Sequence, residues 1–516
     1  MTFSYSEILK LDRFRDSSVP ERTIITESES DRGRILFCAA FRRLQQKAQV
    51  FSLEPNAAVR SRLTHSLEVS QIGRYISDKI CTLLKSDNSI QPDYLVALVT
   101  FVENACLMHD IGNPPFGHFG EAAIKKWFSE KGHECIGKAC KPYGPSRDGE
   151  IEPRAKRALD DFFEFDGNPQ GLRIVTKLQR NKDEFGLNLT KTTLAAYLKY
   201  VRMAGQPGNG RPSTKKAGYF STERDVAENL QQTFGYVENQ RFPLAYIMEA
   251  ADDIAYCISD LEDSIEKELL DQTDALIKIR NDWPLARDRA IKKKAEIKVD
   301  HDYDNSEGED ENENLKYETN IRDILNWAIE GKHKDRQFTF TDFRTSLNRE
   351  IVDYVSERYV SNQQRIFSGN FDTLLPDESA AGSILNAIKS YCRKKVYCHE
   401  SVQWTELAGY TAIYGLLEHF KILLECSEAR FAAALDYKPE CPAGYEIVIE
   451  KKLLKLFPPK YILAYNDAIR NIDRKMTSDG EFIEWNARAH LIVDFVSGMT
   501  DDFAVSTYQT LSGMRI

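Results

Sequence analysis

Apolar residues recur along most of the chain at intervals of three and four positions, which is the spacing of an amphipathic helix. The clearest such stretch covers residues 62–84. Its apolar positions are Leu63, Leu67, Val69, Ile72, Ile76 and Ile80. Further helices are predicted over 94–108, 121–131, 223–234 and 244–270, and no run of alternating strands joined by hairpin turns is evident. The pattern predicts a mostly α fold.

Two stretches interrupt the helical pattern with turn-forming residues. Residues 132–153 are rich in Gly, Pro and Lys, and 206–213 read Gln-Pro-Gly-Asn-Gly-Arg-Pro-Ser. Both compositions are typical of loops. We therefore predict loop insertions near 132–160 and 205–215.

A third interruption, at 300–314, is strongly acidic and almost devoid of apolar side chains. Such a composition predicts an exposed, mobile segment. We place a boundary there, between a catalytic core at 1–299 and a mainly helical C-terminal part at 315–516. The alternative is an insertion within a single body.

Bulk properties of the 516 residues narrow the class of protein. No apolar stretch approaches the roughly 20 residues that cross a bilayer, and no basic segment followed by an apolar one opens the chain. The ten cysteines are scattered without a CxxC pair, which favours reduced thiols. We therefore expect a soluble, cytoplasmic protein. Its net charge of -10 argues against bulk attraction to nucleic acid but leaves room for a local basic cleft.

His109 and Asp110 stand side by side where the predicted helix at 94–108 ends, followed by the stop signals Gly112, Pro114 and Pro115. Imidazole and carboxylate together suit a divalent ion such as Zn, Mn, Fe or Mg, which can activate water for hydrolysis. By itself, a His-Asp pair is weak support for a metal site. The prediction therefore depends on further ligands elsewhere in the chain.

Two other predicted helices carry such ligands. His65 lies in the helix at 62–84, although a lone histidine on an apolar helix is more often a core residue. The later helix contains neighbouring aspartates, and because helix positions i, i+4 and i+8 share a face, Asp252 heads a polar stripe with Tyr256 and Asp260. Asp253 points away from that stripe, so we choose Asp252.

Together, the two histidines and two aspartates leave coordination positions for water and a substrate oxygen, which favours phosphate-ester hydrolysis. His118 and Glu121 stand one helical turn apart just after the two prolines. A carboxylate there can orient the imidazole as a general base or acid. Alternatively, Glu121 caps the next helix and His118 packs on it.

The motifs that carry this chemistry resemble those of the bacterial deoxyguanosine triphosphate triphosphohydrolases of the HD superfamily. The resemblance rests on residues 30–34, 42–51, 62–66, 109–121 and 249–256, and extends through 165–171, 198–200, 215–219, 260–263, 406–410 and 497–501. It implies an HD-domain helical core with an additional helical C-terminal part that contributes to the nucleotide site and the oligomer interface. It also implies hydrolysis of dGTP to deoxyguanosine and inorganic triphosphate, with water attacking the α-phosphorus.

The resemblance also assigns roles to residues of this chain. The divalent ion, one Mn²⁺ or Mg²⁺, would be bound by His65, His109, Asp110 and Asp252, with His118 and Glu121 as the catalytic dyad. The substrate residues would be Gln49 and Asp260 at the sugar 3′-hydroxyl, Tyr256 against the deoxyribose, Asn168, Lys199, Tyr200 and Lys216 on the triphosphate, and Glu406 and Tyr397 near guanine. An arginine that the family also places at the base has no clear match here, with Lys452 and Arg430 as alternatives.

Members of this family form homohexamers and bind single-stranded DNA as an effector, so the resemblance implies both. Basic residues crowd two regions, at 32–62 and 199–216, where a solvated surface is the alternative to anion binding. Three other functions stay open: a broad deoxynucleotide triphosphohydrolase, a nucleotide monophosphatase, and a nucleotide- or DNA-responsive sensor with little turnover.

Overall fold

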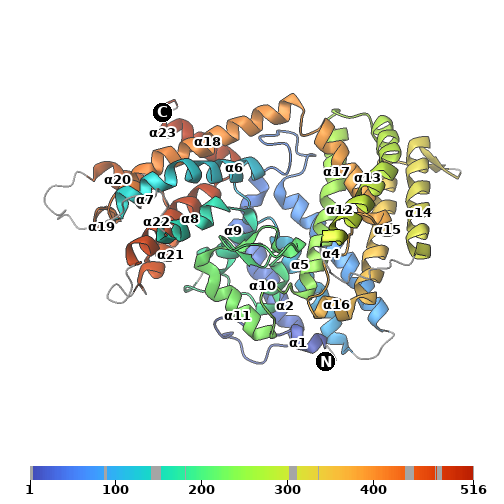
Figure 1. Cartoon of the computed structure of the whole chain (residues 1–516), viewed down its shortest axis with the longest axis horizontal. Coiled ribbons are helices and arrows are strands. Elements are labelled where there is room, and N and C mark those ends of the chain that lie inside the picture. Colours follow the sequence, from blue (N-terminus) through green and yellow to red (C-terminus); the bar gives the residue numbers. More distant parts are fainter. Residues whose placement is uncertain are drawn as a thin grey trace.

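The computed structural model describes residues 4–85, 90–140, 153–180, 182–300, 311–334, 336–435, 447–470, 472 and 479–514. Helices make up nearly all the regular structure in these ranges, which confirms the predicted mostly α fold (Figure 1). The first helices are α1 (Tyr5–Ile8), α2 (Ile24–Phe37), α3 (Ala39–Arg43), α4 (Arg62–Leu84), α5 (Pro92–Met108), α6 (Gly117–Trp127), α7 (His133–Ala139), α8 (Pro153–Phe163), α9 (Gly167–Arg173), α10 (Lys191–Tyr197), α11 (Arg224–Phe234) and α12 (Pro243–Glu266). They are followed by α13 (Gln272–Asp300), α14 (Glu311–Glu330), α15 (Phe340–Ser361), α16 (Gln363–Phe367), α17 (Ala380–Lys395), α18 (Glu400–Glu425), α19 (Glu428–Leu435), α20 (Val448–Leu454), α21 (Pro459–Arg470), α22 (Gly480–Ser497) and α23 (Asp501–Leu511).

Short elements complete the described part of the chain. The π-helical turns η3 (Phe128–Gly132) and η4 (Ile174–Leu178) extend α6 and α9, and the 3-10 turns are η1 (Leu44–Gln46), η5 (Pro212–Thr214) and η6 (Ser221–Glu223). Strands β1 (Arg202–Met203) and β2 (Ala217–Tyr219) pair in parallel, and β3 (Lys332–His333) pairs antiparallel with β4 (Arg336–Gln337). The loop predicted near 205–215 runs between β1 and β2 and contains η5.

Buried side chains form two hydrophobic clusters that both include part of α5. The first joins α4, α5 and α12 to α13–α17 and contains Phe101 and Ile254. The second joins α6–α8 to α18 and α21–α23 and contains Trp127 and Trp485. Because α5 runs from Phe101 in the first cluster to Met108 in the second, its C-terminus lies where the two clusters meet.

The predicted helices at 62–84, 94–108 and 223–234 are present as α4, α5 and α11. The other two differ at one end. α6 begins at Gly117 because Phe116, in a left-handed conformation with φ 60°, turns the chain directly into the helix. α12 ends at Glu266, since Glu268 adopts a positive φ of 57°.

The loop predicted near 132–160 is wrong for α7 and for the first part of α8. α7 buries Cys135 and Ile136 completely, and α8 likewise buries Ala155 and Leu159. These short apolar stripes were masked by the Gly, Pro and Lys content of residues 141–152, which lie outside the described residues. α7 and α8 are therefore helical because their apolar side chains are buried against α18 and α22, although the composition of the region is typical of a loop.

The acidic stretch at 300–314 is described only at its two ends. α13 continues to Asp300 and α14 starts at Glu311, while 301–310 lie outside the described residues. The predicted exposure is wrong for Asn314, which is buried and accepts a hydrogen bond from Ala380 N at 2.9 Å. Helices from both sides of this stretch share the first hydrophobic cluster.

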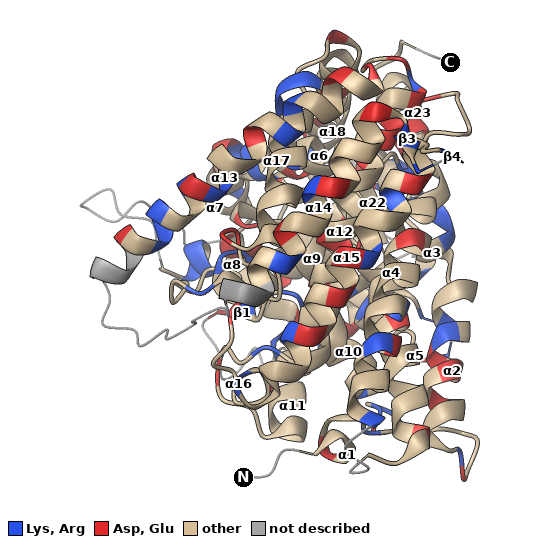
Figure 2. Cartoon of the chain, turned by 90° about the vertical axis from the view of Figure 1, so that its right-hand side faces the viewer, with Lys and Arg blue, Asp and Glu red and all other residues tan. Residues whose placement is uncertain are grey.

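Charged residues of both signs are interspersed along α13, α14 and α15 on the face shown in Figure 2. Across the described part of the chain, no helix has the length and apolar character needed to span a membrane.

Candidate active site

The four predicted metal ligands come from three helices of the N-terminal half. His65 lies in the first turn of α4, whose start is fixed by reciprocal bonds: Ser61 Oγ accepts from Thr64 N at 3.3 Å, and Thr64 Oγ1 accepts from Ser61 N at 3.0 Å. His109 and Asp110 follow the last residue of α5, and Asp252 lies on α12. Each side chain is therefore set by a rigid element.

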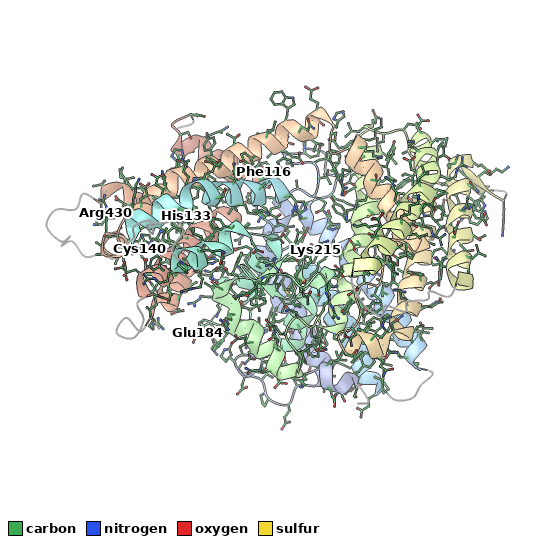
Figure 3. All side chains as sticks on the ribbon, in the orientation of Figure 1. Phe116, His133, Cys140, Glu184, Lys215 and Arg430 are labelled. Atoms are coloured by element: carbon green, nitrogen blue, oxygen red, sulfur yellow. The ribbon has the colours of Figure 1, made fainter. Side chains whose placement is uncertain are left out.

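The turn after α5 rests directly on α9. A Cβ atom at Gly112 would lie 2.0 Å from the carbonyl oxygen of Gly167 and 2.2 Å from the nitrogen of Gly171, so only glycine fits there. The turn ends at Phe116, whose ring lies so close to α18 that a Cβ at Gly409 would lie 2.1 Å from it. Figure 3 shows Phe116 beneath α18.

His65, His109 and Asp110 each offer a ligand atom, and these atoms lie within 4.8 Å of one another. Asp252 Oδ1 lies 3.6 Å from His65 Nε2 and 3.5 Å from His109 Nε2. The structure therefore brings the predicted set together. Within the described ranges, no other group of His, Cys, Asp and Glu side chains gathers in this way.

The donor set fits a divalent ion. His109 Nδ1 lies 2.7 Å from the carbonyl oxygen of Cys106, which fixes the ring and leaves Nε2 facing the carboxylates. His109 Nε2 and both ring nitrogens of His65 are buried and have no hydrogen-bond partner among the described residues. Buried imidazole nitrogens without partners are costly unless an ion or a ligand satisfies them.

Nearby cations keep the two carboxylates ionised. Burial raises the pKa of Asp110, but the adjacent Arg62 guanidinium and the His109 and His65 rings together outweigh it and hold that pKa at about 2. Arg62 Nη1 donates to Asp110 Oδ2 at 2.5 Å. Burial likewise opposes ionisation of Asp252, yet the Lys199 ammonium, 3.1 Å from its Oδ2, holds the pKa of Asp252 well below its usual range. Both groups are thus ready to bind a cation.

His118 and Glu121, the predicted dyad, face each other on the first turn of α6. His118 Nδ1 lies 2.9 Å from Glu121 Oε2, and the other carboxylate oxygen of Glu121 accepts from Gly167 N at 2.9 Å. Glu121 is buried, whereas the His118 side chain is 79% exposed. The carboxylate is therefore fixed at both oxygens and presents the imidazole to solvent.

These groups line one cleft of about 750 Å³. The predicted site residues on its wall are Gln49, His109, Asp110, His118, Glu121, Asn168, Lys199, Tyr200, Lys216, Asp252, Tyr256, Tyr397 and Glu406. The two remaining ones, His65 and Asp260, are buried and contact that wall, since His65 lies beside Asp252 and Asp260 accepts from Tyr397. All the predicted residues thus belong to one site.

Positive charge gathers on one side of the cleft. Lys216 Nζ donates to Asp166 Oδ2 at 2.7 Å, and Asp166 Oδ1 accepts from both nitrogens of Asn168, at 3.0 Å and 2.6 Å. Lys215 lies beside them and is labelled in Figure 3. Asp166 therefore orders the start of α9 together with Lys216.

Hydroxyl and carboxyl groups with raised pKa values also lie in or beside the cleft. The Tyr397 hydroxyl donates to Asp260 Oδ2 and lies 2.8 Å from the Tyr256 hydroxyl. Burial raises the pKa of Asp260 to about 7. Burial also raises the pKa of Glu406, on α18, to about 7. Lys389 Nζ lies 5.6 Å from the centroid of the Tyr256 ring, so a cation is present here too.

Several residues of the site were not predicted. Arg62 stood in a recognised motif, but nothing in its spacing indicated the bond to Asp110. Lys47 is buried and donates to the carbonyl oxygens of Asn113 and Ser497 at 2.6 Å and 2.8 Å. Asp501 accepts from Phe116 N and Ala48 N at 3.1 Å and 3.0 Å. Lys47 and Asp501 stood in the recognised motifs at 42–51 and 497–501, but nothing in those motifs indicated that the two regions meet.

Comparisons with known proteins agree with this site. The family model described as "HD domain" matches residues 62–158, which include His65, His109 and Asp110. The helical fold and the His-His-Asp cluster thus define an HD-domain protein.

Curated relatives narrow the class further. A deoxyguanosinetriphosphate triphosphohydrolase of Enterobacter sp. (strain 638) is 36% identical over 525 residues, covering 98% of this chain and 97% of that protein. One from Yersinia pseudotuberculosis serotype O:3 (strain YPIII) is 36% identical over 517 residues, covering 96% and 95%. The chain belongs to the deoxyguanosinetriphosphate triphosphohydrolase family, as its motifs predicted.

Proposed function

We propose that this protein hydrolyses dGTP to deoxyguanosine and inorganic triphosphate and thereby controls the deoxynucleotide pool. The observation that carries the proposal is the convergence of the His-His-Asp cluster, the His118–Glu121 pair and a lysine-lined wall in one cleft. The relatives' names supply the nucleotide. Water attacks the α-phosphorus and the bond between that phosphorus and the 5′-oxygen of the sugar breaks. Deoxyguanosine leaves with a proton on its 5′-oxygen, and the intact triphosphate is released carrying the oxygen of the water.

A single divalent ion, Mn²⁺ or Mg²⁺, would be held by His65, His109, Asp110 and Asp252. An ion there would supply Lewis acidity, which favours ionisation of the attacking water and charge build-up on phosphate oxygens. Arg62 keeps Asp110 ionised and positioned for this role. The Cys106 carbonyl does the same for the ring of His109.

His118 accepts and donates protons through its Nε2 atom. Because Nδ1 donates to Glu121, the neutral ring has an unprotonated Nε2, which can accept a proton from water or, once protonated, deliver one to an oxygen atom. Glu121 stays in place through its second bond, to Gly167 N. The dyad therefore acts from a helix that is anchored on α9.

Lys199, Tyr200, Lys216 and Asn168 bind the triphosphate. The two ammonium groups line the same cleft and offset the charge of the bound triphosphate and the charge that builds up on its oxygens during the reaction. Gln49 and Asp260 would accept or donate at the 3′-hydroxyl, and the Tyr256 ring packs where a 2′-hydroxyl would clash, which excludes ribonucleotides.

Guanine is recognised by Glu406, whose carboxylate can accept from the N1 and N2 donors of the base, with Tyr397 nearby. Lys452 and Arg430 were the two candidates for a cationic partner at the base. Arg430 forms an ion pair with Glu450, in which its Nη2 lies 2.5 Å from Oε1. The C-terminal part of the chain thus contributes to the nucleotide site through α18.

We further propose a homohexamer, activation by single-stranded DNA and a cytoplasmic location, all of which rest on the family resemblance.

Product analysis tests the proposal. The purified protein is incubated with Mn²⁺ and with each of dGTP, the other three deoxynucleoside triphosphates and GTP, and nucleoside, triphosphate and phosphate are resolved by chromatography. Deoxyguanosine and triphosphate from dGTP alone are expected. Triphosphate from all four deoxynucleotides would indicate a broad triphosphohydrolase, and single phosphates a phosphatase. Binding without turnover, with or without single-stranded DNA, would indicate a sensor.

A further inference from the structure

Tyr397 connects two residues that act on the sugar. It lies in the turn between α17 and α18, where its N–H donates to the carbonyl oxygen of Cys392 at 3.1 Å. The flanking side chains of Val396 and Val402 are buried in the first hydrophobic cluster. The turn, and with it the Tyr397 ring, is therefore held by the core.

The Tyr397 hydroxyl is shared between the two residues. It donates to Asp260 Oδ2 and lies 2.8 Å from the Tyr256 hydroxyl. Burial raises the pKa values of both tyrosines far above neutral, so both keep their protons. Since the single Tyr397 proton is given to Asp260, the Tyr256 hydroxyl donates to the Tyr397 oxygen. The bonds run in one direction, from Tyr256 through Tyr397 to Asp260.

This chain leaves a defined acceptor for a ligand. Asp260 is buried, and its Oδ1 atom has no hydrogen-bond partner in the described part of the chain. With Oδ2 occupied by Tyr397, Oδ1 is the oxygen that remains for a substrate hydroxyl. An unsatisfied buried carboxylate oxygen of this kind favours a ligand that donates to it.

The ring of Tyr256 is constrained from other directions as well. Lys389 Nζ lies 5.6 Å from its centroid, over the face. The His65 ring meets it edge-on, with centroids 6.4 Å apart. These two contacts act on the body of the ring, whereas the hydroxyl bond to Tyr397 holds its far end.

We infer that the Tyr397 hydroxyl is a specificity-determining group for the sugar: it holds the Tyr256 ring and the Asp260 carboxylate in the arrangement that accepts a 3′-hydroxyl and rejects a 2′-hydroxyl. The inference rests on the proposed function and adds to it, because the family resemblance places this side chain near the base only. Tyr397 is thus a positioning residue for sugar selection, acting through Tyr256 and Asp260.

The Tyr397→Phe variant tests the inference, because it keeps the ring and removes only the hydroxyl. Values of kcat and KM are measured for dGTP, GTP and 2′,3′-dideoxy-GTP. The preference for dGTP over GTP is expected to fall about tenfold, the effect of roughly one buried hydrogen bond. The preference over the dideoxynucleotide should fall as well, because Asp260 loses its orientation. The kcat for dGTP should change little, since the groups at the phosphorus are untouched.

Tyr414→Phe is the matched control. Tyr414 lies on α18 and also donates its hydroxyl to a carboxylate, Glu130 Oε2 at 2.7 Å, but outside the cleft. Both sugar preferences should stay at the wild-type values in this variant. Tyr256→Phe breaks the same bond from its other end, so it serves if Tyr397→Phe fails to fold. The double variant should match Tyr397→Phe, because Tyr397→Phe already loses both the bond to Asp260 and the bond to Tyr256, whereas Tyr256→Phe loses only the second.

The outcomes separate the inference from the proposed function. Unchanged sugar preferences in Tyr397→Phe, with wild-type turnover of dGTP, overturn the inference and leave the function standing. If another deoxynucleotide is the better substrate, its preference over the corresponding ribonucleotide and dideoxynucleotide is measured instead. A wild-type protein that turns over no nucleotide overturns both.

Discussion

Opposite charges are paired throughout the cleft at the scale of single residues. Arg62 pairs with Asp110, Lys199 with Asp252, and Lys216 with Asp166. Because these pairs are partly or fully buried, removal of one partner leaves a charge without compensation, which costs more than the pair itself contributes. Truncation of a charged residue in the cleft therefore also affects its partner. For each such variant, ligand binding should be measured as well as turnover.

Glu121→Ala should lower turnover of dGTP by about 10²- to 10⁴-fold, the usual contribution of one positioned acid or base. The His118 ring would lose the carboxylate that sets its proton at Nδ1. Metal content after dialysis should be unchanged, because Glu121 is separate from the ligand cluster. Glu134→Ala, on the exposed side of α7, is the control and should behave as wild type. Normal turnover in Glu121→Ala would remove the dyad from the mechanism.

If Glu406 accepts hydrogen bonds from guanine as proposed, guanine binding should depend on pH. Because burial raises the pKa of Glu406 to about 7, the carboxylate is largely protonated at pH 6 and ionised at pH 8. Only the ionised form can accept from both guanine donors, so the KM for dGTP should fall as the pH rises through 7. The measurement is KM at several pH values between 6 and 8, for wild type and Glu406→Gln. The same pH dependence in Glu406→Gln would assign the titration to another group.

Spacing within one helix predicted which residues would meet. The i, i+4, i+8 rule placed Asp252, Tyr256 and Asp260 on one face of α12. Asp252 and Tyr256 line the cleft, and Asp260 accepts from Tyr397 there. Asp253, expected to point away from this stripe, lines the cleft as well. The bond between Arg62 and Asp110 could not be predicted this way, because it joins two helices. The sequence also could not show that the Tyr397 hydroxyl faces Tyr256 and Asp260. That arrangement depends on how α17 and α18 meet, which no local pattern encodes.

At the scale of elements, α6 depends on α23 for its position. Asp501, in the first turn of α23, accepts hydrogen bonds from Phe116 N and Ala48 N. The Phe116 nitrogen immediately precedes α6, which carries the dyad. The C-terminal end of the chain therefore fixes the start of a catalytic helix, and Lys47 adds a second tie between the same regions.

Asp501→Ala should lower kcat for dGTP about tenfold, because the dyad shifts with the start of α6. It also leaves the buried Phe116 N–H without an acceptor, at a cost of about 1–3 kcal/mol in the free energy of unfolding, and the half-buried Ala48 N–H at a smaller cost. Asp501→Asn keeps one acceptor oxygen and should recover part of both effects. Kinetics and thermal melting measure them, with the exposed neighbour Asp502→Ala as control. An unchanged kcat in a destabilised Asp501→Ala would limit the residue to a structural role.

Element boundaries show where sequence patterns succeed. The long helices α4 and α5 have strong apolar periodicity and appeared as predicted. α7 has only seven residues, too few for periodicity to outweigh the composition of its surroundings, so it was predicted as a loop. The early start of α6 depends on the left-handed Phe116, which packing against Gly409 stabilises. Short elements held by tertiary contacts were thus the ones missed.

At the scale of the whole molecule, the cleft joins parts of the chain that are far apart in sequence. Its walls include residues from Gln49 to Leu407, and both hydrophobic clusters contact it through α5 and α12 on one side and α6 and α18 on the other. The ligands themselves come from α4, the end of α5 and α12. A bound ion would therefore cross-link three helices and stabilise the folded chain as a whole.

Metal removal tests that coupling and the choice between neighbouring aspartates. Since an ion that binds only the folded state adds about 2.7 kcal/mol at roughly 100 times its Kd, Mn²⁺ should raise the melting temperature of the wild type, and EDTA should reverse the shift. Asp252→Ala should lose both the shift and the metal retained after dialysis, because its Oδ1 lies 3.6 Å and 3.5 Å from the two imidazoles. Asp253→Ala, one position along the same helix, should keep both. A shift that survives in Asp252→Ala but is lost in Asp253→Ala would transfer the ligand role to Asp253.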